Sequence, residues 1–213
     1  LGRLQRFLED FGLQQVACTE GALYMRGSGA EPYVHVSLAS ERRGLAWVAF
    51  EVEGEPDLRE AAALPGASVV ETVPGPAGGL RVRLRDPDGF EVHVLQWQGP
   101  PRATRSPART LSNTPWVKAR QGAVLRTSPD EFEVHRLGHV LLHVSDMDAT
   151  AAWYTRILGL TLSDGLTDET GALVGGFYRL AREQEFVDHH CIGFVQSNAA
   201  AGTAALMTAM SSS

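Results

Sequence analysis

The stretch Arg136–Leu160, RLGHVLLHVSDMDATAAWYTRILGL, predicts a strand, a short turn and an amphipathic helix. Alternate residues of a strand share a face, so His139 and a second histidine four positions on lie on one side, opposite an apolar side. Asp146 or Asp148 can cap the helix that follows, and Gly159 can end it. A strand that directs imidazoles toward one side is a candidate for a functional site.

The bulk composition favours a globular protein that acts on small molecules. The chain has 213 residues, of which 44% are hydrophobic, enough for one domain or for two of about 100 residues each, and we predict two. Its formal net charge is -6 with both signs interspersed, so it lacks the basic stripe of a nucleic-acid-binding protein.

No feature of the sequence predicts a membrane or secreted protein. No stretch approaches the roughly 20 consecutive apolar residues of a membrane span, and the first ten residues, LGRLQRFLED, form a charged amphipathic pattern rather than a signal peptide. Cys18 and Cys191 fall in no metal-binding or redox spacing, and we expect two small core residues in a reducing compartment. A cytoplasmic location follows as the expectation.

The chain divides into two segments of similar order. We predict an N-terminal module over 1–98, a linker over 99–135, where proline and arginine interrupt the apolar pattern, and a C-terminal module over 136–213. Four segments of the first module parallel four of the second in the same order: RFLEDFGL with AWYTRILGL, ALYMRG with GFYRLA, YVHVSL with HHCIGF, and GLAWVAFEV with GTAALMTAM. Such self-similarity favours a duplicated unit.

The two copies differ at their ends. The first copy finishes with a predicted hairpin, LRVRLRDPDGFEVHVLQW, but has no strand before Leu1. The second copy has that first strand, yet it stops at Ser213, where the first copy continues to a helix over 57–64 and to the hairpin. We therefore expect both modules to be incomplete. For the uncharged tail 199–213, we expect either that the natural protein is longer or that the residue identities are unreliable.

The order GHVLLHV, WYTRILGL, GGFYRL and DHHCIGF resembles the catalytic module of two-domain type I extradiol ring-cleavage dioxygenases, such as catechol and dihydroxybiphenyl 2,3-dioxygenases. These enzymes belong to the vicinal-oxygen-chelate superfamily, together with glyoxalases and bleomycin-resistance proteins. The resemblance covers most of the chain and is more specific in the second half. It implies an α+β fold of two tandem βαβββ modules, with a non-catalytic N-terminal module and the metal site in the C-terminal one.

The resemblance also implies roles for three histidines. His139 matches the iron ligand on the first strand, His190 matches the acid-base residue, and His189 would stand beside it without touching the metal. The family completes its two-histidine, one-carboxylate site with a second histidine and a glutamate further along the chain. Ala205 occupies the expected position of that second histidine and no carboxylate follows it, so this chain supplies one ligand of three.

The positions of the first module that correspond to this site resemble a degenerate, non-catalytic copy of it. Tyr33, Val34 and His35, then Trp47, then His93 stand at its corresponding positions, so its ligand set is broken. We expect His93 to be a structural or surface residue. The two remaining histidines of the second half are also expected to be structural or exposed: His135 and His143.

These features lead to one expected function and two alternatives. The expected function is cleavage of a catechol-type aromatic diol with O2, at a non-haem Fe(II) centre with Mn(II) as the alternative metal, in aromatic hydrocarbon catabolism. The resemblance implies a homo-oligomer that acts on small molecules. The main alternative is a metal-free, ligand-binding protein of the bleomycin-resistance kind, which the missing ligands favour. A glyoxalase-like lyase with zinc or nickel is the weaker alternative.

Overall fold

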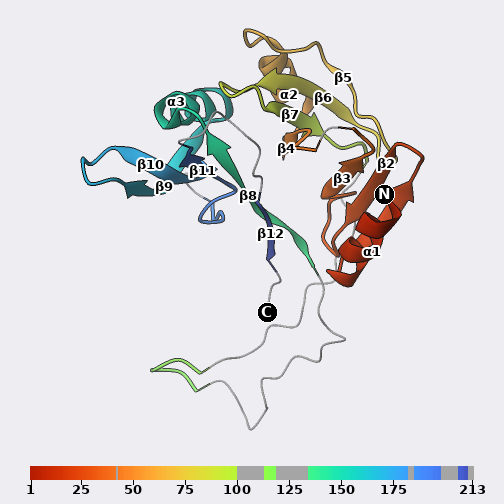
Figure 1. Cartoon of the computed structure of the whole chain (residues 1–213), viewed down its shortest axis with the longest axis horizontal. Coiled ribbons are helices and arrows are strands. Elements are labelled where there is room, and N and C mark those ends of the chain that lie inside the picture. The colour runs from red at the N-terminus through yellow and green to blue at the C-terminus, as the bar shows by residue number, and fades with distance from the viewer. Residues whose placement is uncertain (42, 100–112, 119–133, 182–184, 198–205, 211–213) are drawn as a thin grey trace. The chain divides into compact units, whose positions relative to one another are not determined.

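The structure is a computed structural model, and it describes residues 1–41, 43–99, 113–118, 134–181, 185–197 and 206–210. Figure 1 labels their helices and strands. The Cα positions divide the chain into two compact units. One unit contains the described residues of Leu1–Ser37, Pro101–Leu137 and Ala209–Ser213, and the other contains those of Leu38–Pro100 and Gly138–Thr208.

The smaller unit consists of one helix and a three-stranded sheet of order β1-β2-β3. Its elements are α1 (Gly2–Asp10), β1 (Gln14–Cys18), β2 (Ala22–Arg26) and β3 (His35–Leu38). α1 confirms the amphipathic helix predicted at the N-terminus. Its Leu8 is buried in a small core with Leu13, Leu23, Met25 and Val134.

The larger unit begins with a complete βαβββ run. From here on, "the first module" means this run, which is shorter than the module predicted over 1–98. It contains β4 (Val48–Glu51), α2 (Glu55–Ala62), β5 (Glu71–Thr72), β6 (Leu80–Arg85) and β7 (Glu91–Gln96). The strand order is β4-β7-β6-β5, and β4 pairs with β7 in parallel while the other neighbours are antiparallel. The predicted hairpin is confirmed as β6 and β7.

A second βαβββ run, the second module, has the same topology. It contains β8 (Arg136–Val144), α3 (Met147–Leu158), β9 (Leu160–Thr167), β10 (Leu173–Leu180) and β11 (Ile192–Gln196). β8 pairs with β11 in parallel, and β12 (Leu206–Met210) lies on the other side of β8, giving the order β12-β8-β11-β10-β9. The structure therefore confirms the predicted α+β fold with tandem βαβββ modules.

Local signals set the ends of α3 as the sequence predicts. Of the two candidate caps, Asp146 is the N-cap, because its side chain accepts a hydrogen bond from the backbone nitrogen of Ala149 at 2.9 Å. Gly159 ends the helix with φ 64°, a left-handed conformation that costs glycine little.

The repeat is shorter than the copies inferred from the sequence. The four matched segments do fall on like elements, namely α1 with α3, β2 with β10, β3 with β11, and β4 with β12. However, the range 1–98, predicted as one module, forms two sheets, because β4 pairs with β7 and not with β3. Sequence periodicity identifies strands but does not say which strands pair, so it could not separate these sheets.

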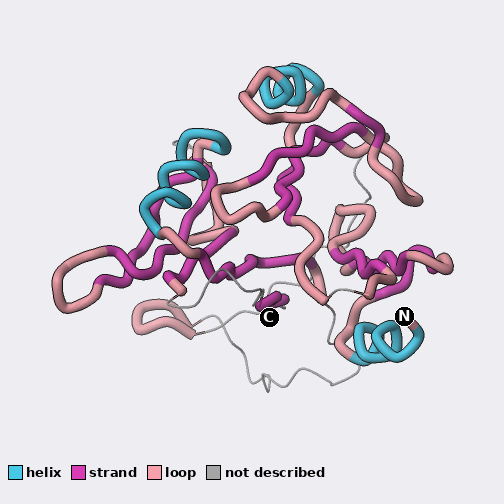
Figure 2. Tube along the Cα trace, turned by 45° about the horizontal axis from the view of Figure 1, so that its top comes forward, coloured by secondary structure: helices cyan, strands magenta, loops and turns pink. Residues whose placement is uncertain are grey.

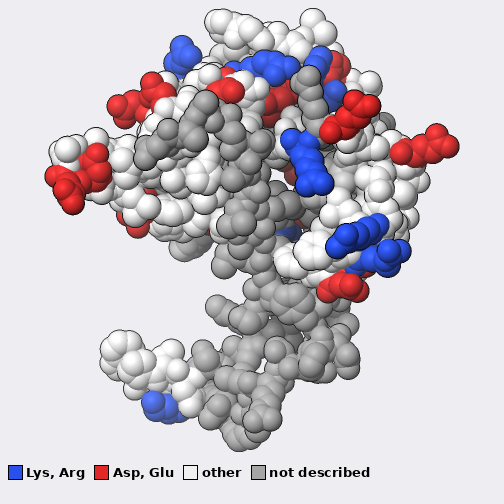
Figure 3. Space-filling model, viewed as in Figure 1, with Lys and Arg blue, Asp and Glu red and all other residues white. Residues whose placement is uncertain are grey.

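One hydrophobic core runs through both modules of the larger unit. It joins Leu58 of α2 and Val92 of β7 to Tyr154 of α3 and Phe194 of β11. Figure 2 shows α2 and α3 as outer elements against the strands of their own modules. Acidic and basic side chains are interspersed on the face drawn in Figure 3. Among the described helices, none has the length and apolar character needed to cross a membrane.

Candidate functional site

Three histidines gather on the second module, from β8 and from the loop before β11. The ring centres of His139 and His190 are 4.4 Å apart, and Phe177 of β10 lies 4.9 Å from His190. The Nδ1 atoms of His189 and His190 are 3.0 Å apart, within hydrogen-bond distance. The structure thus brings together the three site residues that the sequence singled out.

The parallel pairing of β8 with β11 explains this proximity. Val140 aligns with Ile192 in the ladder, so His139 stands beside the chain just after His190. The backbone nitrogen of Val140 donates to the Cys191 carbonyl oxygen at 3.3 Å. His139 lies on the face opposite the core, because the alternate residues Leu142 and Val144 are buried in that core.

A glycine makes room beside the histidines. A Cβ atom on Gly193 would approach Leu141 Cδ1 to 2.6 Å and Phe177 Cδ1 to 3.3 Å. The missing side chain therefore lets Leu141 and Phe177 occupy this space, where Phe177 packs against the ring of His190. Phe177 is a site residue that the sequence reasoning missed, because its place opposite Gly193 depends on the pairing of β10 with β11.

The surroundings favour a neutral imidazole at His190. Burial is the main cause that lowers the pKa of His190, and the neighbouring His139 and His189 lower it further, while Asp188 opposes them. A neutral histidine near pH 7 can accept a proton. Beside it, burial raises the pKa of the Cys191 thiol to about 11, and its Sγ lies 3.6 Å from the Tyr178 carbonyl oxygen. Cys191 is thus half-buried, and the expectation of two core cysteines is wrong for Cys18, which is exposed.

The described part of the chain offers only part of a metal site. Within it, no three histidine, cysteine, aspartate or glutamate side chains are arranged to hold a metal ion together. His139 is suitably placed as one ligand, since it extends from a strand toward the open face. Ala205, the expected position of a second histidine, lies outside the described residues.

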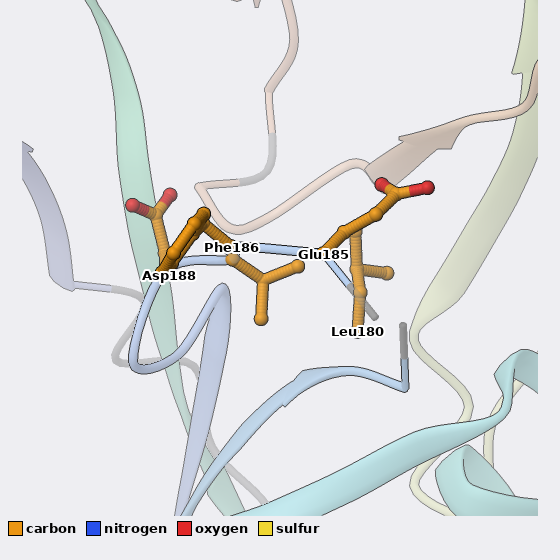
Figure 4. Close-up of a pocket in the computed structure, with 5 residues that line it drawn as sticks. Leu180, Glu185, Phe186 and Asp188 are labelled. Carbon is orange, nitrogen blue, oxygen red and sulfur yellow. The ribbon is translucent and has the colours of Figure 1, made fainter. Parts of the chain in front are cut away.

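An open hollow of about 450 Å³ lies along the loop that leads to the histidines. It is lined by Leu180, Glu185, Phe186, Val187 and Asp188. Figure 4 shows the carboxylates of Glu185 and Asp188 at opposite ends of this group. The hollow thus combines an apolar middle with acidic ends, next in sequence to His189.

On the corresponding face of the first module, polar side chains around His93 bind one another through hydrogen bonds and ion pairs. We call this group the polar network. His93 is 2% exposed, and its ring stacks on Trp47 with centres 5.2 Å apart and planes 13° apart. Its Nε2 lies 2.7 Å from Glu91 Oε1, and its Nδ1 lies 3.5 Å from Arg81 Nη1. A carboxylate accepts and a guanidinium donates, so Nε2 carries the proton and Nδ1 is the acceptor. Of the two roles expected from the sequence, structural or surface, His93 therefore has the structural one.

Glu71 holds two arginines of this network. Its Oε1 lies 2.8 Å from Arg81 Nη2 and 2.8 Å from Arg83 Nε. Burial acts to raise the pKa of Glu71, but the hydrogen bonds and charges of Arg81 and Arg83 outweigh it and lower the pKa. For His93, burial lowers the pKa and the Glu91 hydrogen bond only partly opposes this.

Comparison with known proteins shows what this chain is similar to. The sequence profile of the Glyoxalase/Bleomycin resistance protein/Dioxygenase superfamily matches residues 136–207, which include the three histidines. The chain is 32% identical to metapyrocatechase 2 of Cupriavidus necator over 197 residues, which are 92% of this chain and 57% of that protein.

Solved structures share the fold at lower sequence identity. The Mn(II)-bound glyoxalase of Novosphingobium aromaticivorans is 20% identical with a TM-score of 0.64, over 87% of this chain and 54% of that one. Homoprotocatechuate 2,3-dioxygenase of Arthrobacter globiformis is 19% identical with a TM-score of 0.66, over 93% of this chain and 56% of that one. The chain thus spans a little over half the length of these proteins.

Proposed function

We propose that the chain belongs to the Glyoxalase/Bleomycin resistance protein/Dioxygenase superfamily, whose profile matches residues 136–207, and that it forms part of an extradiol dioxygenase that cleaves a catechol with O2. The observation that carries this proposal is the contact between His139 and His190, whose rings lie 4.4 Å apart on the face of the second module away from the core. The name of metapyrocatechase 2, a protein similar over 92% of this chain, supports the same reaction class.

His139 is the proposed metal ligand. The described residues fit one position of an iron(II) site, so the remaining ligands must come from outside them. Manganese(II) is the alternative, because imidazole and carboxylate sites accept either metal. When bound, the metal would supply the redox chemistry that O2 requires and a positive charge beside the diol.

His190 is the proposed acid-base residue. Its Nδ1 faces His189, so its Nε2 is the ring nitrogen that remains for a substrate hydroxyl. A neutral imidazole can take the catechol proton at Nε2 and return it later, and burial favours that neutral form. His189 would hold the ring of His190 through the contact between their Nδ1 atoms.

Four broader features belong to the same proposal: the domain division, the location, the oligomeric state and the partners. We propose a non-catalytic module over 1–98, a linker over 99–135 and the metal-site module over 136–213; most of this linker lies outside the described residues. We also propose a cytoplasmic homo-oligomer, with a small catechol and O2 as its partners.

Metal content decides between this function and its alternative. A metal-free ligand-binding protein is the second candidate, favoured by the absence of a three-residue ligand set among the described side chains. In the intact protein, His139→Ala should abolish iron binding and ring cleavage, while His143→Ala, on the same face of β8, should keep both. Iron would be measured per protein and cleavage by product absorbance. Equal iron in His139→Ala and parent protein, or neither iron nor manganese in the parent, would reject the dioxygenase.

A further inference from the structure

Hydrogen bonds hold together the end of the β8–β11 pair that lies opposite the histidines. We call this group of bonds the joint. Gln196, the last residue of β11, donates from Nε2 to the Ser145 carbonyl oxygen at 2.6 Å and accepts from the Met147 backbone nitrogen at 2.8 Å. The Ser197 backbone nitrogen donates to the Val144 carbonyl oxygen at 2.8 Å. One amide side chain therefore connects the end of β11 to the turn between β8 and α3.

The first module supplies a second anchor to the same turn. Both carboxylate oxygens of Asp88, in the turn between β6 and β7, lie 3.1 Å from the backbone nitrogen of Ser145. In the same turn, Asp86 accepts a hydrogen bond from the Tyr154 hydroxyl at 3.1 Å, and both side chains are buried. Asp88 also places a negative charge at the start of α3, where the helix dipole favours it.

The joint fixes how β8 lies against β11. In this parallel pair, Val144 aligns with Gln196 at one end and Val140 with Ile192 at the other. A slip of two residues would keep the same faces buried but would displace β8 by about 6–7 Å. His139 and His190 would then separate, and the Gln196 and Asp88 bonds to the turn would break. The hydrophobic pattern alone does not exclude this slip, whereas the joint does.

We propose that Asp88 and Gln196 are positioning residues that lock the register of β8 against β11 and thereby hold His139 beside His190. The first module thus contributes to the histidine site through the turn between β6 and β7. The consequence for metal and substrate rests on the proposed function, but the register lock itself does not.

The chain offers a matched set of variants. Asp88→Ala removes both acceptors for Ser145, Asp88→Asn keeps one oxygen acceptor, and Gln196→Leu removes both of its bonds to the turn. Asp168→Ala is the control, because Asp168 makes similar bonds to the backbone nitrogens of Thr170 and Ala172 within its own hairpin.

The first measurement needs no metal. NMR spectra of protein with ¹³C-labelled histidine should show His139 and His190 signals shifted by their neighbouring rings. We expect Asp88→Ala and Gln196→Leu to move both signals toward free imidazole, Asp88→Asn to lie near the parent, and Asp168→Ala to match it. Parent-like signals in folded Asp88→Ala and Gln196→Leu would overturn the register lock.

The second measurement tests the consequence for the site. In the intact iron-loaded protein, Asp88→Ala should weaken iron retention about 10-fold and lower kcat with little change in KM, as outer-shell changes do. Asp88→Asn should recover most of both, an outcome that a general loss of stability would not give. If the parent holds neither iron nor manganese while the NMR signals respond as expected, the proposed function fails and the register lock stands.

Discussion

The two modules of the larger unit share a topology but use the same face of the sheet in opposite ways. In the first module the face away from α2 carries a closed network, in which His93 is 2% exposed and both of its ring nitrogens face polar partners. In the second module that face carries His139 and His190, with His189 exposed beside them. The βαβββ fold therefore provides a place for a site, and the side chains decide whether it can do chemistry.

The largest expected effect tests the face of the second module that carries His139 and His190. We predict that His190→Gln lowers kcat for catechol cleavage about 10²–10⁴-fold, because proton transfer at this residue is lost, while iron content stays unchanged. His93→Gln, the counterpart change in the first module, should leave kcat at the parent value. Steady-state kinetics with an iron assay would measure both.

Two results would change the assignment of His190. Loss of iron in His190→Gln would make His190 a metal ligand and remove the distinction between it and His139. Full activity would transfer the acid-base role to His189, or would favour the ligand-binding alternative.

The next effect tests the polar network around His93 in the first module. We predict that His93→Ala lowers the free energy of unfolding by about 2–4 kcal/mol, because it leaves a cavity under Trp47 and removes the buried partner of Glu91. Urea denaturation would measure this, with His189→Ala as the exposed control expected within about 0.5 kcal/mol of the parent. A similarly small effect of His93→Ala would show that the network does not stabilise the first module.

A smaller effect tests the link between the modules. Tyr154→Phe should cost about 1–3 kcal/mol, because it leaves the buried Asp86 carboxyl without its hydroxyl donor. Burial already raises the pKa of Asp86 despite the hydrogen bonds that it accepts. The control is Tyr178→Phe, which keeps the aromatic packing on Phe194 and leaves the Tyr154–Asp86 bond in place. Equal stability of the two variants in urea would contradict a stabilising link.

The smallest effect is a dependence of stability on pH. The pKa of His93 is lowered by burial from its ordinary value of 6.5, so the unfolded chain binds the proton more readily than the folded one. The stability linked to His93 is therefore complete above pH 6.5 and is lost as the pH falls toward the lowered folded pKa, by at most about 1.4 kcal/mol per pH unit. The unfolding free energy of His93→Gln should vary less over this range, and an equal slope would argue against a neutral buried His93.

Local signals allowed much of the fold to be predicted from the sequence. Asp146, Gly159 and the Asp86–Gly89 turn act within a few residues, so the cap, the helix end and the hairpin followed from their neighbours. The parallel pairing of β4 with β7 joins residues about 40 positions apart and leaves no local pattern. The sequence therefore predicted one module over 1–98, where the structure has two separate sheets, β1-β2-β3 and β4-β7-β6-β5.

The candidate site was predictable for a similar reason. Residue types and their order identified His139, His189 and His190, because a resemblance is carried by the residues themselves. The contacts of Phe177 with His190 and of Asp88 with Ser145 could not be predicted, since each depends on how separate strands and turns are brought together.

The buried thiol of Cys191 has a consequence for oxidative damage. Its pKa of about 11 leaves roughly one molecule in 10⁴ as the thiolate at pH 7. The thiolate is the form that peroxide attacks, so this sulfur reacts slowly even though it adjoins His190, where the proposed chemistry handles O2. Burial therefore disfavours oxidation of Cys191, and burial also lowers the pKa of its histidine neighbour, His190.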